Sequence, residues 1–149
     1  MRALACSGAG FLLAVLWFDL MFDVQVRRHP AGDVPAAVLA SIAAYYARVT
    51  TAARPMNRLI AAIMLTTIGA TVAELARDEL PRWRAGVALA LTLGAVGLAA
   101  SRTVPNAMRL GRRTDDDAQQ SRLARGILRD HVLCFVAIVA VLLVQLVPA

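Results

Sequence analysis

Apolar positions along the chain gather into five blocks, which are separated by short breaks rich in arginine, proline and aspartate. A helix that spans a bilayer needs about 20 predominantly apolar residues, so each block is near the length required to cross a membrane. The predicted fold is therefore an all-α integral membrane bundle in which residues 1–149 form one domain. The five blocks cover residues 4–26, 34–51, 56–76, 83–101 and 131–147.

The second block is the one whose crossing the pattern leaves open. It is rich in alanine, it carries Tyr45 and Tyr46, and Arg48 near its end shortens its apolar part. These features fit a helix that lies in the membrane interface as well as one that crosses the bilayer. We therefore expect four or five transmembrane helices.

The one strongly polar segment lies between the fourth and fifth blocks, after Pro105 interrupts the apolar pattern. Three aspartates at residues 115–117 stand where the helix dipole favours a helix start. From Ala118 onward, apolar and arginine side chains recur with a helical period, which predicts a cytoplasmic amphipathic helix lying at the lipid headgroups. The arginines of this region that we expect to contact lipid phosphates are Arg112, Arg113, Arg122, Arg125 and Arg129.

The distribution of arginine predicts how the chain is oriented. With five spans, eleven of the 16 basic residues, all of them arginine, fall on the side of the amino terminus. Because short loops rich in Lys and Arg stay in the cytoplasm, we expect a multi-pass protein of the cell (inner) membrane with a cytoplasmic amino terminus. Five spans would place the carboxyl terminus outside.

Composition narrows the class of protein further. The chain is 59% hydrophobic and 17% charged, which is too apolar for an ordinary soluble domain. The net charge of +6 does not indicate nucleic-acid binding, since the arginines are not gathered in one soluble stripe with interleaved aromatic residues. The two cysteines, Cys6 and Cys134, have neither metal-site spacing nor the density of a disulfide scaffold, so we expect no metal and no cofactor.

Two carboxylates in the first block are the most unusual chemistry in the chain. Asp19 and Asp23 lie one helical turn apart, and Asp23 is spaced to pair with Arg27. An acid at membrane depth costs about 2.5–3.5 kcal/mol, so Asp19 needs a partner. The two acids with Glu74 predict a proton or cation site, and the alternative is a structural hydrogen bond from Asp19 to a threonine of the third block: Thr66, Thr67 or Thr71.

A second polar group is expected at the opposite, cytoplasmic side. His131, Asn106 and Arg109 are the candidates for catalysis there, with His131 as the acid or base and the other two polarising a substrate oxygen. The alternative is an ordinary headgroup-level cluster that holds lipid phosphates.

Two parts of the chain carry short motifs: "TVPNAMRLG" followed by "LARGILRDHVLCF", and "YYARVTTAARPMNRLIAAI". They resemble the anthrone-oxygenase-like family of small helical membrane proteins. In that family a Pro-Asn pair precedes the last helix and a histidine opens it, which Pro105, Asn106 and His131 match. The resemblance covers about half of the chain and implies an architecture more than a reaction, since some members of the family oxygenate polyketide anthrones without a cofactor and most have no assigned activity. The chain departs from the family in having Asp130 and Cys134 beside the histidine, where an aromatic residue and an arginine are expected.

Three functions remain open from the sequence. The leading hypothesis is a non-enzymatic accessory or assembly subunit, because Gly86, Ala90 and Gly94 form a small-residue stripe suited to helix association with a membrane protein partner or a second copy. The alternative is a cofactor-independent oxygenase-like membrane enzyme. The second alternative is proton or cation translocation through the acidic residues, so whether the chain is an enzyme stays open.

Overall fold

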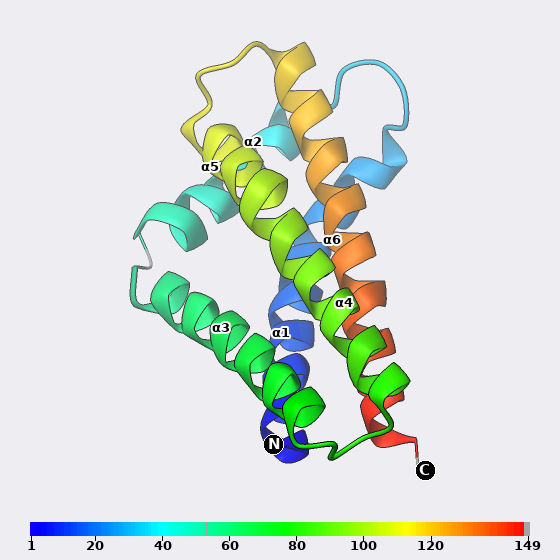
Figure 1. The fold of residues 1–149 in the computed structure, drawn as a ribbon. Coiled ribbons are helices and arrows are strands. Elements are labelled where there is room, and N and C mark those ends of the chain that lie inside the picture. The colour runs from blue at the N-terminus through cyan, green and yellow to red at the C-terminus, as the bar shows by residue number, and fades with distance from the viewer. Residues whose placement is uncertain (53, 148–149) are drawn as a thin grey trace.

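The computed structural model describes residues 1–52 and 54–147, apart from the side chain of Arg54, and these residues form helices joined by short loops (Figure 1). The α-helices are α1 (Arg2–Asp23), α2 (Ala36–Ala47), α3 (Arg54–Ala76), α4 (Arg82–Leu98), α5 (Val104–Arg112) and α6 (Asp117–Leu146). A 3₁₀ turn, η1 (Val24–Arg28), follows α1, and two π-helical turns, η2 (Arg48–Ala52) and η3 (Ala99–Thr103), follow α2 and α4.

Four helical stretches of the described chain are long and apolar enough to cross a membrane: Arg2–Arg28, Pro55–Ala76, Arg82–Arg112 and Asp117–Leu146. This confirms the helical bundle, and the number of candidate spans agrees with the four-helix version of the prediction. Helix α2 has 12 residues, which span only about 18 Å at ~1.5 Å per residue, whereas the hydrocarbon core of a bilayer is about 30 Å thick.

The four long helices alternate in direction, so the amino terminus and the end of α6 lie at the same end of the bundle (Figure 1). Helix α6 packs against α1 and α4, and α3 packs against the same two helices. Five crossings were expected to place the termini on opposite sides, whereas the structure has both at one end of the bundle (Figure 1). That prediction assumed that the second block crosses the membrane. One crossing fewer reverses the orientation of every segment that follows.

Helices α2 and α5, the turn η2 and residues 117–130 of α6 gather at the end opposite the termini (Figure 1). We call this group the cap. Its core holds apolar side chains that are almost completely buried: Val26, Val34, Leu39, Ile42, Tyr46, Ala107, Leu110, Leu123, Ala124 and Ile127. Helices α2 and α5 are in close contact at Gly111, where an added Cβ would stand 2.8 Å from the backbone nitrogen of Ala47.

Helix α4 continues through η3 into α5 as one apolar stretch, although the sequence predicted an interruption at Pro105. The proline lies in the first turn of α5, where a missing N–H costs no hydrogen bond within that helix. The π-helical turn η3 before it accommodates the change in backbone hydrogen-bond pattern at the proline.

The predicted amphipathic segment after Ala118 runs without a break into the fifth apolar block, residues 131–147. It forms the first half of α6, which begins where Asp116 accepts a hydrogen bond from the backbone N–H of Gln119 at 2.7 Å. Its apolar side, with Leu123 and Ile127, packs into the cap core. The aspartates therefore mark the helix start as predicted, and the apolar face is already covered by the chain itself.

Candidate functional site

Five polar side chains from three helices meet where the cap joins the long helices. Helix α1 contributes Asp19 and Asp23, α2 contributes Tyr45 and Tyr46, and α6 contributes His131. We call this group the Asp–His–Tyr cluster. It joins residues that the sequence assigned to two opposite sides of the membrane.

Asp23 is completely buried and has two partners. The hydroxyl of Tyr46 donates to its Oδ1 at 2.6 Å, and Nδ1 of His131 lies 2.6 Å from its Oδ2. The ion pair expected with Arg27 is replaced by these contacts. The reason is local, because the chain tightens into the 3₁₀ turn η1 after Asp23, and a residue four positions on no longer shares its face.

Asp19 lies one turn before Asp23 and has a matching pair of neighbours. The hydroxyl of Tyr45 donates to its Oδ1 at 2.7 Å, and its Oδ2 is 3.7 Å from Nε2 of His131. These contacts of Asp19 take the place of the expected hydrogen bond to a threonine of α3. Thr67 instead donates to the carbonyl of Ile63 at 2.7 Å, within its own helix.

The two tyrosines are functional candidates that the sequence did not single out. Burial raises the pKa of both hydroxyls, and the carboxylates of Asp19 and Asp23 raise it further. Both side chains therefore remain protonated hydrogen-bond donors. The sequence does contain a signal for this pairing: two adjacent tyrosines in one apolar block can each bond to one of two aspartates that lie one turn apart in another. In the structure, Phe22 also stacks on Tyr45 with ring centroids 4.0 Å apart.

The arrangement holds the imidazole of His131 between two carboxylates. The short contact of Nδ1 with Asp23 fixes the orientation of the ring, as a hydrogen-bonded carboxylate does for histidines in enzymes and metal sites. Nε2 then faces Asp19 across a longer gap. The cluster can hold a proton between these groups, and it ties three helices together.

Glu74 lies away from this cluster. It is completely buried, and its Oε2 accepts a hydrogen bond from the side-chain amide of Gln145 at 2.5 Å. Its position near the end of α3, beside the end of α6, places it toward the termini, whereas Asp19 lies toward the cap (Figure 1). The structure therefore does not bring Glu74 together with Asp19 and Asp23, because α3 runs antiparallel to α1 and α2 lies within the cap (Figure 1).

Asn106 and Arg109 have surroundings of their own. Arg109 is on the surface of α5 and forms two hydrogen bonds with Asp115, at 2.6 and 2.8 Å. Asn106 lines a cleft between α5 and α6, and His131 does not line that cleft. The structure thus brings His131 together with the two aspartates instead of with these two residues.

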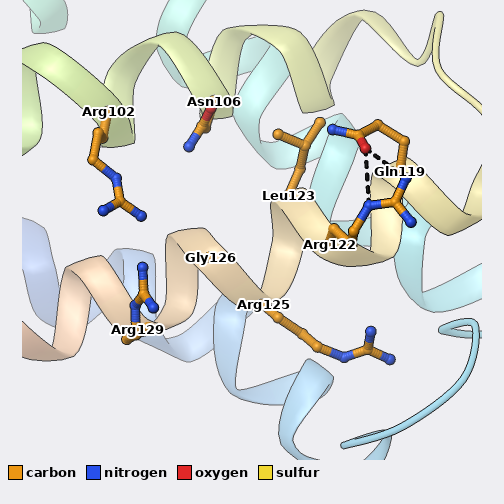
Figure 2. A pocket seen from close by; sticks show the side chains of 8 residues that line it. All are labelled: Arg102, Asn106, Gln119, Arg122, Leu123, Arg125, Gly126 and Arg129. Atoms are coloured by element: carbon orange, nitrogen blue, oxygen red, sulfur yellow. Dashed lines mark hydrogen bonds between the residues drawn. The ribbon is translucent and has the colours of Figure 1, made fainter.

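The cleft has a volume of about 520 Å³ and is strongly basic (Figure 2). It contains three of the arginines expected at lipid headgroups, Arg122, Arg125 and Arg129. Of the other two, Arg112 is exposed at the end of α5, and Arg113 lies 3.9 Å from Asp117. The lining consists of Arg102, Asn106, Gln119, Arg122, Leu123, Arg125, Gly126 and Arg129.

Over the described residues, no group of three or more His, Cys, Asp or Glu side chains is arranged to hold a metal ion. Comparison of the chain with protein-family models, with curated proteins and with solved structures gives no match.

Proposed function

We propose that the chain is a multi-pass membrane protein that acts as a non-enzymatic accessory or assembly subunit of a larger membrane complex. Four helical stretches of suitable length and hydropathy support the membrane part of this proposal. The polar side chains of the Asp–His–Tyr cluster bond to one another across three helices, which supports a structural role for them.

The observation that carries the subunit role is the outward face of α4. Ala85, Ala88 and Ala95 are buried against the rest of the bundle. A second row of small residues, Gly86, Ala90, Gly94 and Gly97, turns away from it, and a Cβ added at any of the three glycines would meet nothing within 4 Å.

Small residues at regular spacing allow two helix backbones to approach closely, and this contact drives association where lipid removes the hydrophobic effect. A row that the chain does not use for its own packing is therefore available to a transmembrane helix of a partner.

We further propose that the cap faces the cytoplasm and that the amino terminus lies outside. With four spans, only Arg2, Arg77, Arg82 and Arg84 of the 16 arginines belong to the end that holds the termini. The remaining twelve belong to the cap end, and the cytoplasmic side is the one enriched in arginine. This orientation reverses the earlier expectation, which counted α2 as a crossing.

Photo-crosslinking in native membranes tests the subunit role. A benzophenone amino acid is placed at Ala90 or Gly94 of the outward row, and as a matched control at Leu65, which is 70% exposed on α3. We expect a discrete crosslinked protein band from the first two positions and none from the control. A product at twice the chain's 15.9 kDa would identify a second copy as the partner. Crosslinking to lipid alone at all three positions would contradict the proposal.

A second candidate function is acid–base catalysis at His131, which the position of its ring between two carboxylates favours. The resemblance to the anthrone-oxygenase-like family suggests an anthrone as substrate, with His131 removing a proton before reaction with oxygen. Anthrone oxidation by membranes that contain the chain should then fall to background in His131→Gln, a variant that keeps a hydrogen-bonding side chain. Equal rates in both proteins would eliminate this candidate.

Translocation is the third candidate, and the position of Glu74 relative to Asp19 makes it the least supported of the three. Glu74 would have to continue a path from Asp19, yet it lies toward the other end of the bundle, beside Gln145. Leu12 and Leu16 occupy the stretch of α1 that leads from Asp19 toward that end. Proton flux into liposomes that is lost in Asp19→Asn would instead make translocation the leading candidate.

A further inference from the structure

The cleft between α5 and α6 carries a concentration of positive charge that its own contacts leave largely unbalanced. Four of the residues that line it are arginines, and Asn106 adds a side-chain amide. In the described part of the chain, the ion pairs that these arginines make are both with one carboxylate, Asp130. The local charge is therefore clearly positive.

Two of the guanidinium groups are bonded to neutral partners. Arg125 donates to the backbone carbonyls of His29 and Gly32, which fixes the loop after η1 against α6. Arg122 donates to the side-chain oxygen of Gln119 at 2.9 and 2.7 Å. Neutral acceptors order these arginines and leave their charges in place.

The other two guanidinium groups come from opposite walls of the cleft. Figure 2 shows Arg102 and Arg129 extending toward each other across it. Their Nε atoms lie 3.4 and 3.5 Å from the oxygens of Asp130, which is completely buried behind them. Both side chains are at least half exposed, so their remaining N–H groups are open to a ligand.

The wall formed by α6 leaves room for a bound group. Gly126 lines the cleft, and a Cβ built on it would meet nothing within 4 Å. A ligand can thus approach the helix between the arginines on either side. The Asp–His–Tyr cluster is not part of this wall, because His131 is two positions from Arg129 and so points to roughly the opposite side of α6.

We propose that this cleft binds a phosphate group, and that the phosphate belongs to the headgroup of an anionic lipid. Guanidinium groups bind phosphate oxygens through two parallel, charge-assisted hydrogen bonds. The position of the cleft along the helices also fits a lipid headgroup, because Arg102 follows the apolar stretch of α4 and Arg129 precedes the apolar half of α6. The lipid source rests on the proposed membrane location, but it does not depend on any docking through α4.

Ligand-induced stabilisation of the full-length chain in a neutral detergent tests the proposal. The probes are short-chain phosphatidylglycerol, short-chain phosphatidylcholine, glycerol 1-phosphate and inorganic phosphate, each titrated while the unfolding midpoint is followed. The first cleft variant is Arg122→Gln with Arg129→Gln, which leaves Arg102 beside Asp130. The second is Gly126→Leu, which fills the cleft without changing the charge.

The matched control is Arg27→Gln with Arg28→Gln, two exposed arginines of η1 that do not line the cleft. We expect phosphatidylglycerol to stabilise the wild-type chain and phosphatidylcholine to have little effect. Each cleft variant should weaken the apparent affinity by about tenfold or more, since hydrogen bonds to charged groups are worth about 1.5–3 kcal/mol. The control should change it less than about twofold, because exposed charges are screened.

The source of the phosphate is read from the same titrations. If glycerol 1-phosphate or inorganic phosphate stabilises the chain with the same dependence on the cleft variants while the lipid does not, the site binds phosphate and its ligand is a soluble compound. The proposal is overturned if none of the phosphates stabilises the chain, or if the control variant weakens binding as much as the cleft variants do. Neither result bears on crosslinking at Ala90 and Gly94, so the two proposals fail separately.

Discussion

His131 and Asp23 are 108 positions apart in the chain, and their side chains are in contact: Nδ1 of the histidine lies 2.6 Å from Oδ2 of the aspartate. The contact joins α6 to α1 at the level where the cap begins. Tyr46 adds α2 to the same carboxylate. One buried aspartate therefore fixes the positions of three helices.

Replacing that aspartate should cost much of the stability of the bundle. Asp23→Ala leaves the hydroxyl of Tyr46 and the ring of His131 buried without the carboxylate that both contact. Removal of one partner from a buried polar network costs about 3–5 kcal/mol. Reversible unfolding in mixed detergent measures the change. Asp78→Asn is the control, because Asp78 is exposed and pairs with Arg82 on the surface, so its loss should leave the unfolding free energy nearly unchanged. Similar losses from both variants would show that the contact with His131 does not join the helices.

The tyrosine hydroxyls make the same cluster visible to an optical titration. Tyr45 and Tyr46 are the only two tyrosines of the chain, so tyrosinate absorbance reports on the cluster alone. Both have raised pKa values in the folded state, because burial and the nearby carboxylates disfavour the anion. The stabilisation from protonated hydroxyls is therefore complete below the unfolded pKa of about 10 and is lost as the pH rises above it.

We expect no tyrosinate signal at about pH 11 while the chain stays folded, and a full signal at that pH after unfolding. Far-ultraviolet circular dichroism on the same samples separates ionisation from unfolding. A signal that develops near pH 10 with unchanged helicity would show that the two hydroxyls are in contact with water.

The sequence predicted the four long helices and the start of α6 because those features are local. Runs of apolar residues and a cluster of aspartates before a helical repeat need no knowledge of the fold. The neighbours of Asp19 depended instead on whether one block, residues 34–51, crosses the membrane. If it crosses, Asp19 and Glu74 lie at the same side. In the structure this block lies within the cap, and Asp19 meets His131. No local pattern in a block that carries both alanines and tyrosines decides between these outcomes.

Cysteine labelling in intact cells tests directly whether residues 34–51 cross the membrane. In a background with Cys6 and Cys134 replaced by alanine, single cysteines are placed at Ala31 and Thr114, in two exposed loops at the cap end of the bundle, and at Arg77 near the termini. We expect the two cap positions to be protected from an impermeant reagent and Arg77→Cys to react. Labelling of Ala31→Cys and Thr114→Cys on opposite sides would restore a fifth span.

Close contact between α5 and α2 predicts a second effect on stability. Gly111→Ala adds a Cβ that would stand 2.8 Å from the nitrogen and 3.1 Å from the Cα of Ala47. Backbone atoms cannot rotate away, so α5 must shift, and overpacking of this kind costs about 1–3 kcal/mol. Gly69→Ala on α3 is the control, since its added Cβ meets nothing within 4 Å and alanine favours a helix by up to about 1 kcal/mol. The unfolding free energy in detergent should thus fall in the first variant and stay the same or rise in the second.

The pair formed by Glu74 and Gln145 allows a structural role to be separated from a charge-dependent one. Both side chains are completely buried, and among the described residues Oε1 of each has no hydrogen-bond partner. Glu74→Gln keeps the shape and one hydrogen bond and removes an acid whose ionised form would be costly to bury, so we expect stability to be unchanged or to rise by about 1–2 kcal/mol. Gln145→Leu removes the amide that binds the carboxylate and should cost about 1–3 kcal/mol.

Measured together, the two variants assign the pair. A loss of stability in Gln145→Leu with none in Glu74→Gln means that the contact holds the ends of α3 and α6 together without needing a charge. If Glu74→Gln instead destabilises the chain as much as Gln145→Leu does, the carboxyl group itself is required at this position. The carboxyl group would then need a partner beyond the amide of Gln145, since Oε1 of Glu74 has no hydrogen-bond partner among the described residues.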